Sequence, residues 1–124
     1  DTEKIKENEM SSLHVTDRAA AAVAVAPRVS LDSIEAKIAE RHDFTAGRAV
    51  AALALPTSPN SPLDILSLCV LVMRNGFVVV GKSAPASPEN FNAELGRKFA
   101  YEDAVRQLWP LEGFALRERL AGAI

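Results

Sequence analysis

The sequence predicts a small α+β fold: an N-terminal helix, an antiparallel β-hairpin, a long α-helix and a short C-terminal helix. Three observations predict it. Apolar residues recur at helical spacing after Ser30, two apolar runs flank Asn75-Gly76, and a capped helical pattern starts at Ser87. A chain of 124 residues is long enough for one domain with a modest core. We place that domain at residues 30–124, after a variable and flexible leader at residues 1–29. The leader's alanine-rich tract favours a helix but could equally be frayed.

The first helix is predicted from Leu31 to Arg41. Ser30 can cap it, and Leu31, Ile34 and Ile38 fall on one face at spacings of three and four residues. The small apolar segment Ala46–Leu55 then fits either a short helix or a weak strand. Three prolines between residues 56 and 62 indicate a loop.

The runs Ile65–Met73 and Phe77–Val80 predict a β-hairpin, because both are rich in β-branched and aliphatic residues. Asn75-Gly76 between them suits a two-residue type I′ turn. The apolar residues do not alternate cleanly, so we expect both faces to be covered. The chain's own helices can cover one face, and a second copy of the chain would cover the other.

The segment after the hairpin predicts a long helix. Ser87 is placed to cap it, with Pro88 in its first position. Phe91, Leu95 and Phe99 recur every four residues and predict the face turned to the core. The same face is expected to continue through Ala100, Ala104, Val105 and Leu108.

Two residues within this helix, Gly96 and Pro110, disfavour a regular helix. Gly96 costs up to about 1 kcal/mol relative to alanine, so we expect another backbone to approach closely there. Pro110 predicts that the helix ends after Trp109, and a shorter helix is expected over Leu111–Ala121.

Composition excludes several classes of function. Fourteen basic against sixteen acidic residues give a net charge of −2, which argues against general nucleic-acid binding. No apolar run approaches the roughly 20 residues of a membrane span. Cys69 is the single cysteine and lies within an apolar run, so we expect a buried, inert thiol. His14 and His42 stand far from it and from each other, so no metal site is expected.

Motifs for catalysis are also missing. The sequence contains no phosphate-binding glycine loop and no nucleophile elbow. We therefore expect a protein that is not an enzyme and uses no cofactor, and we expect it in the cytoplasm.

Short motifs in the second half of the chain resemble a known family. They are Asn75-Gly76-Phe77, Gly81, Asn90-Phe91, Glu94-Leu95-Gly96-Arg97-Lys98, Ala100, Ala104 and Trp109-Pro110-Leu111-Glu112-Gly113. In these motifs the chain is similar to the small tailed-phage and prophage proteins of the gp forty-nine-like family. The resemblance is strong over about the last half of the chain and weak over Val29–Leu55.

This family includes the Thoeris anti-defence one proteins. These are phage-encoded sponges that bind a cyclic ADP-ribose isomer made by bacterial TIR-domain enzymes, and so keep the downstream effector inactive. The resemblance therefore implies a binder of a small cyclic nucleotide, without catalysis, that works as a homo-oligomer with pockets near the subunit interfaces.

Such a ligand needs cations for its phosphates, an aromatic ring for its base, and amides or hydroxyls for its sugars. The first turn at Ser87–Asn90 would also offer free backbone N–H groups to an anion. Arg97 is the first choice, because no glutamate precedes it by four residues. The candidate ligand-binding residues are Lys82, Ser87, Asn90, Phe91, Asn92, Arg97, Lys98 and Arg106.

Each candidate also has a structural role open to it. Phe91 fits a core position, and Lys98 and Arg106 fit ion pairs with Glu94 and Glu102. Two other functions also stay open. The apolar hairpin suits a protein-interaction module that blocks a host factor. DNA binding through the cations of the long helix is weaker, because the pI is about 5.7.

Overall fold

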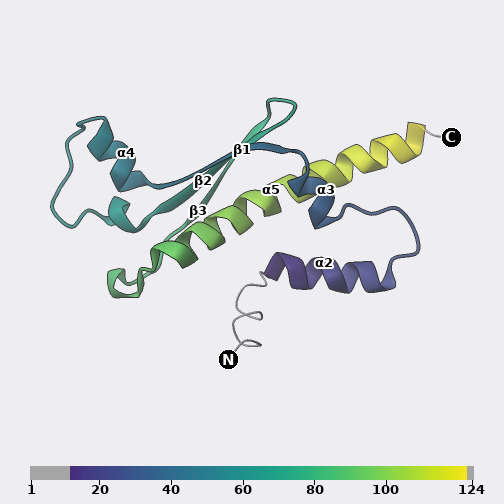
Figure 1. Ribbon diagram of the computed structural model, residues 1–124, viewed down its shortest axis with the longest axis horizontal. Helices are drawn as coiled ribbons and strands as arrows, with labels where there is room; N and C mark the ends of the chain where they lie inside the picture. Colours follow the sequence, from purple (N-terminus) through teal and green to yellow (C-terminus); the bar gives the residue numbers. More distant parts are fainter. Residues whose placement is uncertain (1–11, 123–124) are drawn as a thin grey trace. The chain divides into compact units, whose positions relative to one another are not determined.

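The structure is a computed structural model that describes residues 12–122. The predicted α+β class is confirmed (Figure 1). The elements in chain order are α2 (Ser12–Val23), α3 (Leu31–Glu35), β1 (Ile38–Thr45), α4 (Ala46–Ala52), the 3-10 turn η1 (Pro62–Ile65), β2 (Ser67–Met73), β3 (Val78–Ser83), the 3-10 turn η2 (Pro88–Asn90) and α5 (Ala93–Gly122).

The chain divides into two compact units. One consists of Asp1–Lys37 and Leu108–Ile124, and the other of Ile38–Gln107. The second unit holds the whole β-sheet, α4 and the first half of α5. The alanine-rich tract of the predicted leader forms part of the helix α2, and residues 1–11 lie outside the described part of the chain.

The sheet has three antiparallel strands in the order β1-β2-β3, so the predicted hairpin supplies its second and third strands. The first strand was not predicted. We expected a helix from Leu31 to Arg41, but it ends at Glu35, and Ile38–Thr45 pairs with β2. The Ser30 cap is confirmed, since its Oγ accepts from the backbone N–H of Ser33 at 3.1 Å. Apart from an irregularity between Ile38 and Glu40, pairing with β2 supplies hydrogen bonds along β1, and local helical spacing does not reveal this pairing.

The hairpin turn differs from the predicted type I′ turn. The backbone N–H of Gly76 donates to the carbonyl of Met73 at 2.9 Å, and the N–H of Met73 donates to the carbonyl of Phe77 at 2.8 Å. Gly76 alone in this loop has a positive φ, of 88°. Asn75 instead accepts from the N–H of Phe77 through its Oδ1 at 3.0 Å. This is a three-residue loop in which glycine occupies the left-handed position.

Helix α5 packs directly on one face of the sheet. A Cβ at Gly81 of β3 would overlap the carbonyl oxygen of Ala100 and the Cβ of Ala104. A Cβ at Gly96 would overlap the Oγ of Ser67, so the close neighbour of Gly96 is a side chain and not the backbone that we predicted. Small residues on both surfaces therefore set the distance between helix and sheet.

Two side chains of α5 also occupy the free edge of β3. The backbone N–H of Lys82 donates to Oδ2 of Asp103 at 2.9 Å, and Nε2 of Gln107 donates to the carbonyl of Val80 at 2.7 Å. An edge strand normally leaves such groups open to another chain. Here the helix satisfies two of them.

The two faces of the sheet are not equally covered. Along β2, burial alternates, with Ser67, Cys69, Leu71 and Met73 buried. The residues between them are only partly buried, and the outward side chains of β3 are about half exposed. We call the second surface the open face. Its apolar residues are Phe44, Leu68, Val70, Val72, Val78 and Val80, and the polar residues Glu40, His42 and Lys82 lie on the same face. We predicted that both faces are covered. Within the described chain, this is true of the face against α5 and not of the open face.

The bounds of the long helix were predicted wrongly. Residues Pro88–Asn90 form a single 3-10 turn, and the helix begins at Ala93, where Oδ1 of Asn92 accepts from the N–H of Leu95 at 3.0 Å. At its other end α5 continues through Pro110 to Gly122, so there is no separate helix over Leu111–Ala121. Proline removes one backbone bond without forcing a break when the rest of the helix holds.

The predicted core stripe of this helix is confirmed at Ala100, Ala104, Val105 and Leu108, and it is wrong at Leu95 and Phe99. Leu95 and Phe99 are 45% and 49% exposed, whereas Ala100, Ala104 and Val105 are fully buried. The small residues face the sheet because only they permit close packing there, and the larger ones lie away from it.

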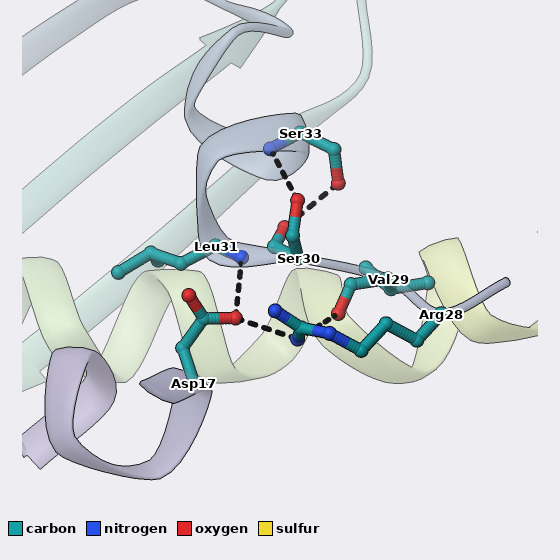
Figure 2. A network of polar contacts seen from close by, with 6 residues as sticks. All are labelled: Asp17, Arg28, Val29, Ser30, Leu31 and Ser33. Atoms are coloured by element: carbon teal, nitrogen blue, oxygen red, sulfur yellow. Dashed lines mark hydrogen bonds and ion pairs between the residues drawn. The ribbon is translucent and has the colours of Figure 1, made fainter. Parts of the chain in front are cut away.

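In the other unit, Asp17 of α2 connects to the start of α3 (Figure 2). Its Oδ1 accepts from Nη1 of Arg28 at 2.8 Å and from the backbone N–H of Leu31 at 3.0 Å. The hydrogen bond from Arg28 is the main reason why the pKa of Asp17 lies below its usual 3.8. Leu31 and Ile34 beside it are buried.

We predict that Gly81→Ala destabilises the protein by about 1–3 kcal/mol, because the added Cβ overlaps α5. Gly113→Ala is the matched control, since no atom lies within 4 Å of a Cβ added there. The control should instead stabilise α5 by up to about 1 kcal/mol. Urea unfolding would measure both, and equal effects at the two glycines would contradict the packing.

We predict that Asp17→Asn lowers the free energy of unfolding by about 1–2 kcal/mol at neutral pH. The folded-state pKa of Asp17 is depressed, so its contribution is complete above the usual carboxyl pKa of 3.8. It is lost as the pH falls through the lower folded-state value. The two proteins should therefore converge in stability in acid, as urea unfolding at several pH values would show. A difference in free energy of unfolding between the two proteins that stays constant with pH would contradict this role of Asp17.

Candidate functional site

The candidate site is a pocket of about 160 Å³ at the C-terminal end of β1. Its walls come from β1, the start of α4, the first residue of β2, the segment that leads into α5, and the start of α5 itself. All of these belong to the unit Ile38–Gln107. The lining residues are Asp43, Phe44, Thr45, Arg48, Ser67, Phe91, Ala93 and Arg97.

Two arginines line this pocket from different helices. Arg48 belongs to the first turn of α4, which Thr45 caps by accepting from the N–H of Arg48 at 3.3 Å. Arg97 lies one turn into α5. Across residues 12–122, neither guanidinium makes a hydrogen bond or an ion pair. Guanidinium groups hold phosphate and carboxylate through paired N–H donors, so these two can meet an anion.

Asp43 brings a negative charge to the same pocket, but a neighbour already compensates it. Nε of Arg41 donates to Oδ2 of Asp43 at 2.9 Å. The guanidinium carbon of Arg41 also lies 4.1 Å from the ring centroid of Tyr101 of α5. Within the described residues, the buried Oδ1 of Asp43 has no hydrogen-bond partner. The pocket and this ion pair therefore carry a net positive charge from Arg48 and Arg97.

Cys69 lies next to this ion pair but takes no chemical role. It is completely buried, as predicted, and burial raises its thiol pKa to about 11. Asp43 raises that pKa further, while Arg41 acts in the opposite direction. The thiol is therefore protonated at neutral pH and is a poor nucleophile.

The pocket brings together two of the predicted site residues, Arg97 and Phe91. Arg106 pairs with the buried Glu102 at 3.5 Å, as the alternative reading of that residue expected. Asn92 caps α5 through its side chain, whereas Ser87 makes no such bond at η2. The other predicted residues do not line the pocket; they are Lys82, Ser87, Asn90, Asn92, Lys98 and Arg106.

Sequence reasoning missed Arg48, Asp43, Thr45 and Ser67 as pocket residues. Arg48 carried one usable signal, since it is a cation in an otherwise small and apolar segment. The other three had none. Asp43 and Thr45 reach the pocket because β1 pairs with β2, which sets Asp43 opposite Cys69 and Thr45 opposite Ser67.

Within residues 12–122, no group of three or more histidine, cysteine, aspartate or glutamate side chains is placed to hold a metal ion. None of the helices in that range is both long and apolar enough to cross a membrane.

Comparison with known proteins identifies the family. Residues 29–120 match the Phage protein (N4 Gp49/phage Sf6 gene 66) family. The chain belongs to this family. The match includes both pocket arginines and every strand of the sheet. No curated protein and no solved structure gives a significant match.

Proposed function

We propose that this phage-family protein binds and sequesters a small cyclic nucleotide of the cyclic ADP-ribose isomer class without chemical change. The observation that carries the proposal is the convergence of Arg48 and Arg97, both without a partner in the described chain, on one pocket. The ligand class comes from the resemblance to the anti-defence sponges. Removing such a signal in the host cytoplasm would silence the defence that depends on it.

The lining chemistry supports an anionic ligand with a ring. Arg48 and Arg97 supply charge and paired donors, and Thr45 supplies a hydroxyl. Phe91 supplies an aromatic wall for a base or a sugar. Nucleotides combine these features, and their phosphates carry the negative charge that two arginines need.

The size of the pocket bears on how such a ligand is held. About 160 Å³ is smaller than the roughly 300–1,000 Å³ that is typical of small-molecule sites. The pocket can take a phosphate and part of its sugar. The remainder of the nucleotide needs further surface, and a second copy of the chain would provide it.

A homo-oligomer is therefore part of the proposal. The open face supplies a surface for it, because Val78 and Val80 are 49% and 48% exposed beside partly buried aliphatic residues of β2. Contiguous apolar surface of this kind favours protein contacts.

The open face also favours the second candidate function, a module that binds and blocks a host protein. The two candidates differ in what occupies that face. A chain that is monomeric when pure, and that recovers one stoichiometric host protein from lysate, would favour the second.

We predict that isothermal titration detects binding of cyclic ADP-ribose isomers, and that Arg97→Gln weakens it by about tenfold to a hundredfold. Arg48→Gln should have a similar effect, because each guanidinium meets the phosphates. Chromatography after incubation should return the ligand unaltered.

Arg74→Gln is the matched control, since it removes the same charge in the hairpin turn at the far end of β2 from the pocket. It should leave the affinity unchanged. Absence of binding by any cyclic ADP-ribose isomer or cyclic dinucleotide at tens of micromolar would sink the proposed function.

We predict that light scattering gives a mass above the 13.3 kDa of one chain, and that Val80→Lys lowers it. A lysine at this position, opposite Val70 of β2, would place a charge in an apolar interface. Val25→Lys is the control, because Val25 is fully exposed and should tolerate the same change. A wild-type protein that is a monomer at high concentration would overturn the proposal of a homo-oligomer.

A further inference from the structure

We propose that Arg41 is a positioning residue that keeps the pocket open to anions by holding Asp43 away from Arg97. The inference rests on the proposed function in that it concerns the same pocket. It does not depend on which anion the protein takes in the cell.

The first step is the placement of Arg41 and Asp43. They are two residues apart on β1, so their side chains lie on the same face of the strand. Nε of Arg41 donates to Oδ2 of Asp43 at 2.9 Å. Arg41 does not line the pocket, whereas Asp43 does. The cation thus engages the carboxylate from outside the pocket.

The second step is what holds Arg41 itself. Its guanidinium carbon lies 4.1 Å from the centre of the Tyr101 ring. An arginine over an aromatic face gains a cation–π contact and loses freedom to turn elsewhere. Tyr101 is four residues after Arg97, so one face of α5 both anchors Arg41 and carries the unpaired arginine.

The third step is the competition inside the pocket. Asp43 and Arg97 line the same small space, yet no ion pair joins them. A carboxylate fixed beside an arginine competes with a dissolved anion, because its local concentration is far higher. Arg41 removes this competition by satisfying Oδ2 of Asp43 first. Without it, Asp43 would pair with Arg97 and cancel the charge that binds the ligand.

The test is a double-substitution cycle measured by isothermal titration with inorganic pyrophosphate and with ADP-ribose. Arg41→Gln should weaken binding of both probes by about 1.5-fold to fivefold, the range expected for one partly exposed ion pair. Asp43→Asn in the same chain should restore the affinity. Asp43→Asn alone should raise it above that of the wild type, because Arg41 then adds its charge.

Arg74→Gln controls for the loss of one positive charge, and thermal unfolding confirms that each variant is folded. The double variant separates positioning from a structural role, since a damaged fold would not regain affinity on losing Asp43. Failure of the rescue, or no gain from Asp43→Asn alone, would overturn the proposal.

The outcomes also separate this inference from the proposed function. Pyrophosphate binding with rescue, but no binding of cyclic ADP-ribose isomers, would keep the inference and reject the ligand class. Tight binding of a cyclic ADP-ribose isomer that is unchanged by Arg41→Gln and by Asp43→Asn would support the proposed ligand class and overturn this inference. If neither the wild type nor Asp43→Asn binds any probe, both proposals fall.

Discussion

The close packing of α5 on the sheet is the constraint on which the unit Ile38–Gln107 depends. Gly81 lets Ala100 and Ala104 approach β3, and Gly96 does the same at Ser67 of β2. At this distance Asp103 and Gln107 reach the backbone of β3 and satisfy groups on its edge. The first turns of the helix also come to lie beside β1. The pocket exists because small residues let the helix lie this close.

Electrostatics then distinguishes the pocket within a nearly neutral chain. The acidic groups nearby have cationic partners: Arg41 pairs with Asp43, and Arg106 with Glu102. Arg48 and Arg97 are different, because the described chain gives their guanidinium groups no partner. Pairing one set of charges and leaving another unpaired makes a local anion site possible without an overall basic charge.

Family and structure contribute different parts of the functional argument. Residues 29–120 place the chain in a phage protein family, and a family by itself does not fix a ligand. The structure adds a pocket lined by Arg48 and Arg97, and an open face on which Val78 and Val80 are about half exposed. The two features are distinct, because Asp43, Thr45 and Ser67 of the pocket lie on the side of the sheet that α5 covers and not on the open face.

Local signals in the sequence determined the α+β class, the Ser30 cap, the hairpin and the buried Cys69. They also singled out Arg97 and Phe91, which both line the pocket. The tertiary structure decided the rest. β1 forms because β2 pairs with it, and that pairing brings Asp43 and Thr45 to Ser67. Leu95 and Phe99 lie outward because only small residues fit against the sheet. α5 also continues through Pro110. Local spacing records the preference of a segment for helix or strand, but strand pairing and close packing draw their free energy from residues that are distant in the chain.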